Sequence, residues 1–199
     1  MIDSKLRGKV QHLFDIPARL FITLKVPPNA ITVCAFVIGI LCGVFIAIDR
    51  PWIAVFLLWL SGFLDVIDGS VARLSNKSSN LGAYLDLVLD RMVEAAVILG
   101  FAFLLPSNYI AYLLFFVAVI FNFSSVIVAG ALFKNTGEKI MHYDVGIAER
   151  TETFVVFTLM ILFNKNVYWI LMIFNIIIFL TGIIRFIKII RQENQNSNK

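Results

Sequence analysis

The feature that most limits the possible folds of this chain is a series of apolar stretches, each close to the length that crosses a lipid bilayer. A helix needs about 20 apolar residues to cross a hydrocarbon core of about 30 Å. Of the 199 residues, 60% are hydrophobic and 15% are charged, whereas soluble domains carry about 25% charged residues. The sequence therefore predicts an all-α, polytopic membrane protein with six transmembrane helices, at residues 30–48, 51–71, 83–105, 107–133, 150–164 and 167–190.

The segment before the first span also has a helical pattern. Residues 4–25 place apolar side chains every three or four positions among charged ones, which predicts an amphipathic helix lying at the membrane interface. A flexible polar leader is the alternative, because Pro17 interrupts the pattern. We accordingly expect an N-terminal interfacial helix and linker at 1–29, a six-helix domain at 30–190, and a disordered polar tail at 191–199.

The distribution of Lys and Arg predicts the orientation in the membrane, since cytoplasmic loops carry an excess of both. Arg50 and Lys165 fall on one side of the predicted spans, and Arg91 lies inside the third. We therefore expect an integral protein of the cell membrane with both termini in the cytoplasm. On that side its basic residues would attract anionic lipids and negatively charged substrates. We expect no nucleic-acid partner. The remaining basic residues, all on the predicted cytoplasmic side, are Lys5, Arg7, Lys9, Arg19, Lys25, Arg73, Lys77, Lys134, Lys139, Arg150, Arg185, Lys188, Arg191 and Lys199.

Four aspartates stand out at the predicted cytoplasmic ends of the second and third spans. Asp65 and Asp68 are three residues apart and Asp86 and Asp90 are four apart, so each pair shares one face of its helix. An Asp in the middle of a membrane helix costs about 2.5 to 3.5 kcal/mol, so the group needs a neutralising partner. Carboxylates without His or Cys favour hard cations that bridge phosphates. The pattern predicts divalent cations, Mg²⁺ or Mn²⁺, and a phosphate-bearing substrate.

Small residues and one arginine accompany these aspartates. Small residues would let a nucleotide lie close against the helix, and the guanidinium of Arg73 would bind phosphate oxygens. The candidate substrate-binding residues at the cytoplasmic ends of the first three spans are Asn29, Thr32, Asp68, Gly69, Ala72, Arg73 and Gly82.

The four aspartates and four of their neighbours fill all eight fixed positions of the pattern DxxDGxxARx8GxxxDxxxD. These positions are Asp65, Asp68, Gly69, Ala72, Arg73, Gly82, Asp86 and Asp90. With this spacing, and with a six-span layout, the chain resembles the CDP-alcohol phosphatidyltransferases of phospholipid biosynthesis. The resemblance implies transfer of a phosphatidyl group from a CDP-linked lipid, usually CDP-diacylglycerol, to an alcohol, with release of CMP. It further implies that Asp65, Asp68 and Asp86 bind metal, and that Asp90 helps to bind a second cation and acts as the base.

The sequence leaves the acceptor alcohol open. Residues 90–91 and 146–152 resemble the phosphatidylinositol-phosphate synthase branch, which favours a phosphorylated polyol such as inositol phosphate or glycerol 3-phosphate. That branch often has a second arginine where this chain has Thr153. A zwitterionic acceptor such as serine is therefore an alternative. The candidate acceptor-binding residues are Lys134, Arg150 and Arg185.

A divalent-cation transporter or channel is the alternative from another functional class, because acids inside spans also form ion paths. Such a path predicts acids spread across the depth of the membrane. The aspartates instead gather at the cytoplasmic half of two spans, which favours the transferase.

Two further features invite structural interpretations. Arg91 is expected to orient Glu94 or an aspartate rather than to touch substrate. Gly39 and Gly43, four residues apart in the first span, predict close helix packing, either within the chain or between the two subunits of a homodimer.

Overall fold

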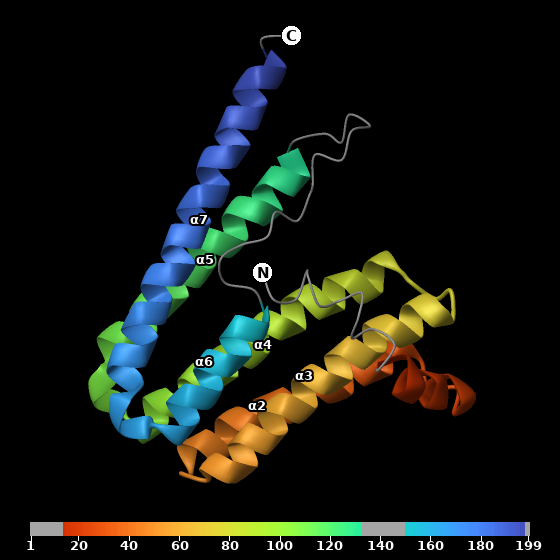
Figure 1. The fold of residues 1–199 in the computed structure, drawn as a ribbon, viewed down its shortest axis with the longest axis horizontal. Coiled ribbons are helices and arrows are strands. Elements are labelled where there is room, and N and C mark those ends of the chain that lie inside the picture. Colours follow the sequence, from red (N-terminus) through yellow and green to blue (C-terminus); the bar gives the residue numbers. More distant parts are fainter. Residues whose placement is uncertain (1–13, 133–149, 198–199) are drawn as a thin grey trace. The chain divides into compact units, whose positions relative to one another are not determined.

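The structure, a computed structural model, describes residues 14–132 and 150–197, and every regular element in these residues is helical (Figure 1). This confirms the predicted all-α class. A helix at residues 14–23 comes first, and two short 3₁₀ turns precede α5 and α7. The main helices are α2 (Pro28–Ala47), α3 (Pro51–Leu74), α4 (Asn80–Leu104), α5 (Tyr109–Leu132), α6 (Arg150–Leu162) and α7 (Val167–Ser197).

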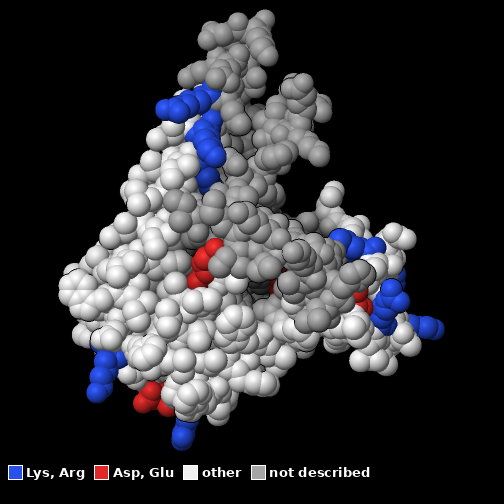
Figure 2. Space-filling view, viewed as in Figure 1, with Lys and Arg blue, Asp and Glu red and all other residues white. Residues whose placement is uncertain are grey.

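Four helical stretches in the described residues are long and apolar enough to cross a membrane. They identify an integral membrane protein, and most of the described surface visible in Figure 2 is uncharged, as lipid-facing helices require. The helix α4 is not among them, because it carries Asp86, Asp90, Arg91 and Glu94. With 13 residues, α6 is about 20 Å long. The count of six spans therefore stays a prediction, and the four candidates are Pro28–Ala47, Pro51–Leu74, Pro106–Leu132 and Asn164–Arg191.

The chain divides into two compact units. The first, the α2–α4 unit, contains the helix at 14–23, α2, α3, α4 and the end of α6. The second, the α5–α7 unit, contains α5, α7 and the start of α6. All four aspartates of the motif belong to the α2–α4 unit.

Glycines allow α2 and α4 to touch along their backbones. A Cβ atom at Gly43 would lie 2.3 Å from the carbonyl oxygen of Ala96, and one at Gly100 would lie 2.3 Å from the carbonyl oxygen of Gly43. A Cβ atom at Gly39 would lie 2.5 Å from a methyl carbon of Val93. The small residues of the first span therefore serve a contact within the chain. The homodimer stays a prediction, and the glycine face of α2 does not support it, because that face packs against α4.

The helix at 14–23 rests on the ends of α2 and α3 through buried apolar side chains. Ala18, Ile31, Ile67 and Val71 form one buried cluster. Lys25 then ends the segment with a left-handed backbone, φ 55°. Residues 4–13 of the predicted interfacial helix lie outside the described residues, so its position at the membrane surface stays a prediction.

In the α5–α7 unit the two long helices are joined by a buried amide. The Nδ2 group of Asn175 donates to the carbonyl oxygen of Ala111 at 2.9 Å, and Asn175 is buried. The rings of Phe115 and Phe174 stack beside this hydrogen bond, with centroids 6.5 Å apart.

The end of α7 corrects one prediction. The polar tail at 191–199 is predicted to be disordered, but α7 remains helical through Ser197, the last residue that the structure describes. No Gly or Pro interrupts the chain after Gly182, and Arg, Gln and Glu have good intrinsic helix propensity. The polar composition of the tail therefore does not stop the helix.

Candidate functional site

A tight connection sets α4 beside α3. After α3 the chain turns at Asn76, which has a left-handed φ of 52°, and the N–H of Lys77 donates to the carbonyl oxygen of Ala72 at 2.9 Å. Ser79 then caps α4, since its Oγ accepts the N–H of Gly82 at 3.0 Å. This cap was not among the sequence predictions, although a serine directly before a helix is its usual signal. The turn and cap place the end of α3 next to the start of α4.

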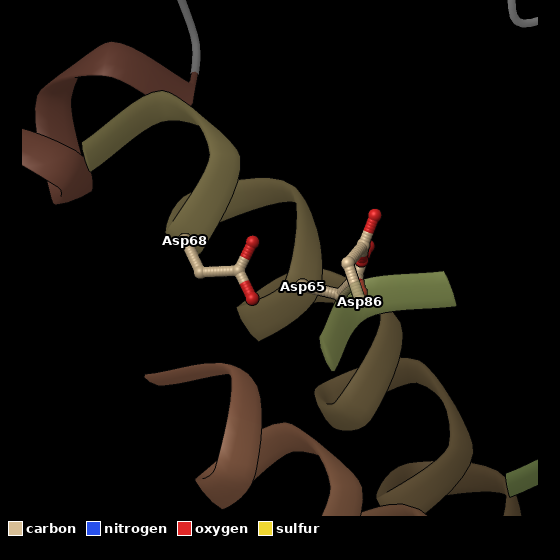
Figure 3. Close-up of side chains that lie close together, drawn as sticks. All are labelled: Asp65, Asp68 and Asp86. Atoms are coloured by element: carbon tan, nitrogen blue, oxygen red, sulfur yellow. The ribbon is translucent and has the colours of Figure 1, made fainter. Parts of the chain in front are cut away.

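Three of the four predicted aspartates converge across this connection. Asp65 and Asp68 come from α3 and Asp86 comes from α4, and one carboxylate oxygen of each lies within 4.8 Å of the others (Figure 3). Asp68 is buried, while Asp65 and Asp86 are partly exposed. The site therefore has a closed side at Asp68 and an open side at the other two carboxylates.

The fourth aspartate, Asp90, is not a member of this three-residue group. It lies four residues after Asp86 on α4, so it shares the stripe of Asp86 and sits one turn further along the helix. Asp90 is partly exposed. This arrangement separates one carboxylate from the three that gather.

The group of three fits a hard cation. At the 4.8 Å limit, two carboxylates repel by about 3 kcal/mol at an effective dielectric constant of 20, so a cation between them would relieve substantial repulsion. Oxygen ligands on opposite sides of one Mg²⁺ or Ca²⁺ are about 4 to 5 Å apart. The all-oxygen donor set and this spacing match Mg²⁺ or a similar ion.

The candidate residues of the first span lie close to the start of α4. A Cβ atom at Gly82 would lie 3.2 Å from Oδ1 of Asn29 and 3.3 Å from Oγ of Ser79. Asn29 and Gly82 therefore approach each other from two helices. Thr32 is buried, and its hydroxyl donates within α2 to the carbonyl oxygen of Pro28 at 3.2 Å. The structure thus gives Thr32 a contact inside its own helix.

Arg73 lies in the last turn of α3. Its NH2 group donates to Oγ of Ser70 at 3.1 Å, and its NH1 atom lies 3.2 Å from the place where a Cβ atom of Gly69 would be. Ala72, the other small residue of the motif, is partly exposed. The guanidinium is therefore held back along α3 beside the small residues.

Arg91 forms an ion pair with Glu94. The NH1 atom of Arg91 lies 2.8 Å from Oε2 of Glu94, and Glu94 is buried. The predicted contact of Arg91 with Glu94 is therefore present, and the absence of a contact with substrate stays a prediction. The pair places a compensating positive charge beside the buried acid on α4.

The candidate acceptor residues are described only in part. Lys134 lies outside the described residues, and only the backbone of Arg150 is described, at the first residue of α6. Arg185 belongs to the α5–α7 unit, and its NH1 group donates to Oδ1 of Asn122 at 2.9 Å. Figure 2 shows basic side chains along the C-terminal part of α7, where Arg185 and Lys188 lie. Asn122 was not among the predicted site residues, although an amide in the middle of an apolar helix indicates a polar contact.

A family model and several curated proteins match this chain. A family model described as CDP-alcohol phosphatidyltransferase matches residues 25–181. The chain is 31% identical over 99 residues to archaetidylinositol phosphate synthase of Pyrococcus horikoshii, covering 50% of this chain and 53% of that protein. It therefore spans about half the length of this relative. It is 32% identical over 173 residues to inner membrane protein YnjF of Escherichia coli, covering 82% of each.

A solved structure with a similar fold is described with a ligand bound. The crystal structure of Mycobacterium tuberculosis phosphatidylinositol phosphate synthase with CDP-DAG bound matches with a TM-score of 0.66, covering 92% of each chain. At 17% sequence identity, this match shows a shared fold.

Proposed function

We propose that this chain, which belongs to the CDP-alcohol phosphatidyltransferase family, moves a phosphatidyl group from CDP-diacylglycerol to an alcohol and releases CMP. The observation that carries the proposal is the convergence of Asp65, Asp68 and Asp86 within 4.8 Å. These residues stand at the motif positions that the resemblance assigns to metal binding. The similar structure, described with CDP-DAG bound, supports the choice of donor.

Divalent cations are the proposed cofactors, Mg²⁺ or Mn²⁺. Asp65, Asp68 and Asp86 would hold one ion, and Asp90 would complete the site for a second. When bound, the cations neutralise the diphosphate of the donor and the charge that develops on the departing CMP. Asp68, the buried member, would fix the ion on its closed side.

Asp90 is the proposed general base. Its carboxylate would take the proton of the acceptor hydroxyl, and the resulting oxygen would attack the phosphorus that carries the diacylglycerol. A new P–O bond to the acceptor forms as the P–O bond to CMP breaks. Asp90 stands at the motif position that the resemblance assigns to the base, one helical turn after Asp86 on α4.

Arg73 and the small residues are proposed to bind the nucleotide part of the donor. Gly69 and Gly82 leave room for the nucleotide against α3 and α4, and the approach of Asn29 to Gly82 brings an amide to the same place. Arg73 would bind phosphate oxygens through its guanidinium. This set lies on one unit with the carboxylates.

The proposed acceptor is a phosphorylated polyol, either inositol phosphate or glycerol 3-phosphate. The name of the P. horikoshii relative, archaetidylinositol phosphate synthase, supports an inositol phosphate. Lys134, Arg150 and Arg185 are proposed to bind the acceptor phosphate, and serine is the alternative acceptor. The membrane arrangement proposed with this chemistry has six spans, with the site and both termini on the cytoplasmic side of the cell membrane.

The proposal is tested with purified protein in lipid vesicles. CDP-diacylglycerol, Mg²⁺ or Mn²⁺ and a panel of inositol phosphate, glycerol 3-phosphate and serine are supplied, and CMP release and the mass of the lipid product are measured. Inactivity with the whole panel in both metals would refute the proposal. Nucleotide-independent flux of a divalent cation into vesicles would favour the transporter instead.

The matched variants are Asp68→Asn and Asp15→Asn. Asp68→Asn should weaken both donor binding and turnover, because it removes a carboxylate from the group of three. Asp15 is an acid of the same unit in the helix at 14–23, outside the motif. Its substitution should leave turnover near the wild-type value.

A further inference from the structure

The side chain of Arg73 folds back along α3, although the residue is exposed. An arginine in the last turn of a helix is free to extend into solvent. Here the NH2 group bonds to Oγ of Ser70 at 3.1 Å, and NH1 approaches the Cα of Gly69 closely enough that a Cβ there would be 3.2 Å away. The guanidinium therefore lies back over Gly69 and Ser70, one turn before its own Cα.

Ser70 is itself fixed in position. It is 1% exposed, and its hydroxyl donates to the carbonyl oxygen of Val66 at 3.1 Å. A hydroxyl has one hydrogen to donate and two lone pairs that accept. Because the hydrogen is used within α3, the oxygen faces Arg73 as an acceptor. The buried serine thus offers a rigid anchor to a flexible cation.

The anchored guanidinium is held toward the carboxylates. Asp65, Gly69 and Arg73 follow one another at intervals of four residues, so they lie on one stripe of α3. A guanidinium that lies over Gly69 is one turn from Asp65 along this stripe. An arginine extended into solvent would point away from that carboxylate.

We infer that Ser70 is a positioning residue, which holds the guanidinium of Arg73 over Gly69 so that it meets the diphosphate of the CDP-linked donor. The inference rests on the proposed function and names a position that the family pattern leaves unspecified. An arginine that is already oriented loses less rotational freedom when its ligand binds. Ser70 therefore strengthens donor binding without touching the donor.

The first test compares two serine substitutions on α3. Ser70→Ala removes the acceptor for Arg73 together with the bond to Val66. Ser75→Ala is the matched control, because Ser75 makes only the second kind of bond, donating to the carbonyl oxygen of Val71 at 2.6 Å. Ser70→Ala should raise the KM for CDP-diacylglycerol about two- to tenfold, the range of one net hydrogen bond, with kcat nearly unchanged. Ser75→Ala should leave both constants close to the wild-type values.

The second test asks whether Ser70 acts through Arg73. In an Arg73→Ala background, Ser70→Ala should cause no further rise in KM. If the two effects multiply, Ser70 does not act through the guanidinium and the inference is wrong. A purely structural serine would instead lower thermal stability and kcat in both backgrounds.

A third test does not depend on whether Ser70→Ala folds. Ser70→Thr and Ser70→Val have nearly the same shape and differ only in the hydroxyl. The Thr variant should keep a lower KM than the Val variant, because only Thr retains the acceptor.

The possible failures are distinguishable. If the wild-type chain releases no CMP, the proposed function fails and this inference with it. If the wild type is active but Ser70→Ala keeps its KM, only the role of Ser70 is wrong.

Discussion

The contact between α2 and α4 predicts that Gly43→Ala lowers both stability and turnover. The added Cβ atom would lie 2.3 Å from the carbonyl oxygen of Ala96 and 2.7 Å from its carbonyl carbon. Both of these are backbone atoms, which cannot move aside as a flexible side chain would. To reach an ordinary contact, the two helices must separate by about 1 Å.

The structure sets the expected magnitude. A gap of 0.5 to 1 Å forfeits roughly a quarter to a half of each dispersion contact, and the side chains packed near this crossing include the buried Ile46 and Val97. Adding a methyl group to such a packed contact costs about 1 to 3 kcal/mol. Because Asp86 is carried on α4, the same displacement should also lower the rate of CMP release by at least about tenfold.

The two cysteines of the chain offer a direct assay. Cys42 is buried beside Gly43 and Cys34 is exposed, so in a Cys34→Ser background a thiol-reactive dye should report unfolding only through Cys42. Heating Gly43→Ala in detergent should expose Cys42 at a lower temperature than in the parent. The matched control is Val44→Ala, since Val44 is exposed and adjacent in sequence. An unchanged melting temperature and rate for Gly43→Ala would refute the close contact.

Three further predictions concern charges and polar contacts. Asp90→Asn should lower turnover about 10²- to 10⁴-fold while CDP-diacylglycerol binding stays largely intact; near-normal turnover would show that Asp90 is not the base. Arg91→Ala should destabilise the protein by about 1 to 3 kcal/mol. This is less than the loss on breaking a fully buried ion pair, because the side chain of Arg91 is 36% exposed. Adding Glu94→Gln should recover part of the lost stability in thermal melting, and no recovery would contradict the pairing. Asn122→Ala should raise the KM of the phosphorylated acceptor about two- to tenfold and leave the donor KM unchanged, because Arg185 loses its orienting partner; an unchanged acceptor KM would count against a role of Arg185 in that pocket.

The sequence predicted the helical class and the meeting of carboxylates from two helices because both depend on local spacing. Apolar runs of bilayer length admit few structures except helices. Asp65 and Asp68 share one helical face by their spacing alone, and a connection of five residues between α3 and α4 leaves little choice but an antiparallel pair. The convergence with Asp86 followed from these two facts.

Other features could not be predicted because they depend on contacts distant in sequence. Gly39 and Gly43 indicated close packing, but spacing within one helix does not identify the partner as α4. The partner of Arg185 is Asn122, 63 residues away, and no local pattern links them. The polarity of the tail at 191–199 predicts disorder, whereas helix propensity and the absence of Gly or Pro favour the helix that continues to Ser197.

The packing of α2 explains how the carboxylates stay together. Asp65, Asp68 and Asp86 repel one another when no cation lies between them, and this repulsion tends to separate α3 from α4. The helix α2 opposes it because it contacts both: Ser61 of α3 donates to the carbonyl oxygen of Ala35 at 2.8 Å, and α4 meets α2 through its glycines. A helix that contributes no carboxylate to the group of three therefore holds the two acidic helices at a distance that suits a cation. The glycines in α2 and α4 thus help to set the spacing of the carboxylates, because bulkier residues there would move the acidic helices further apart.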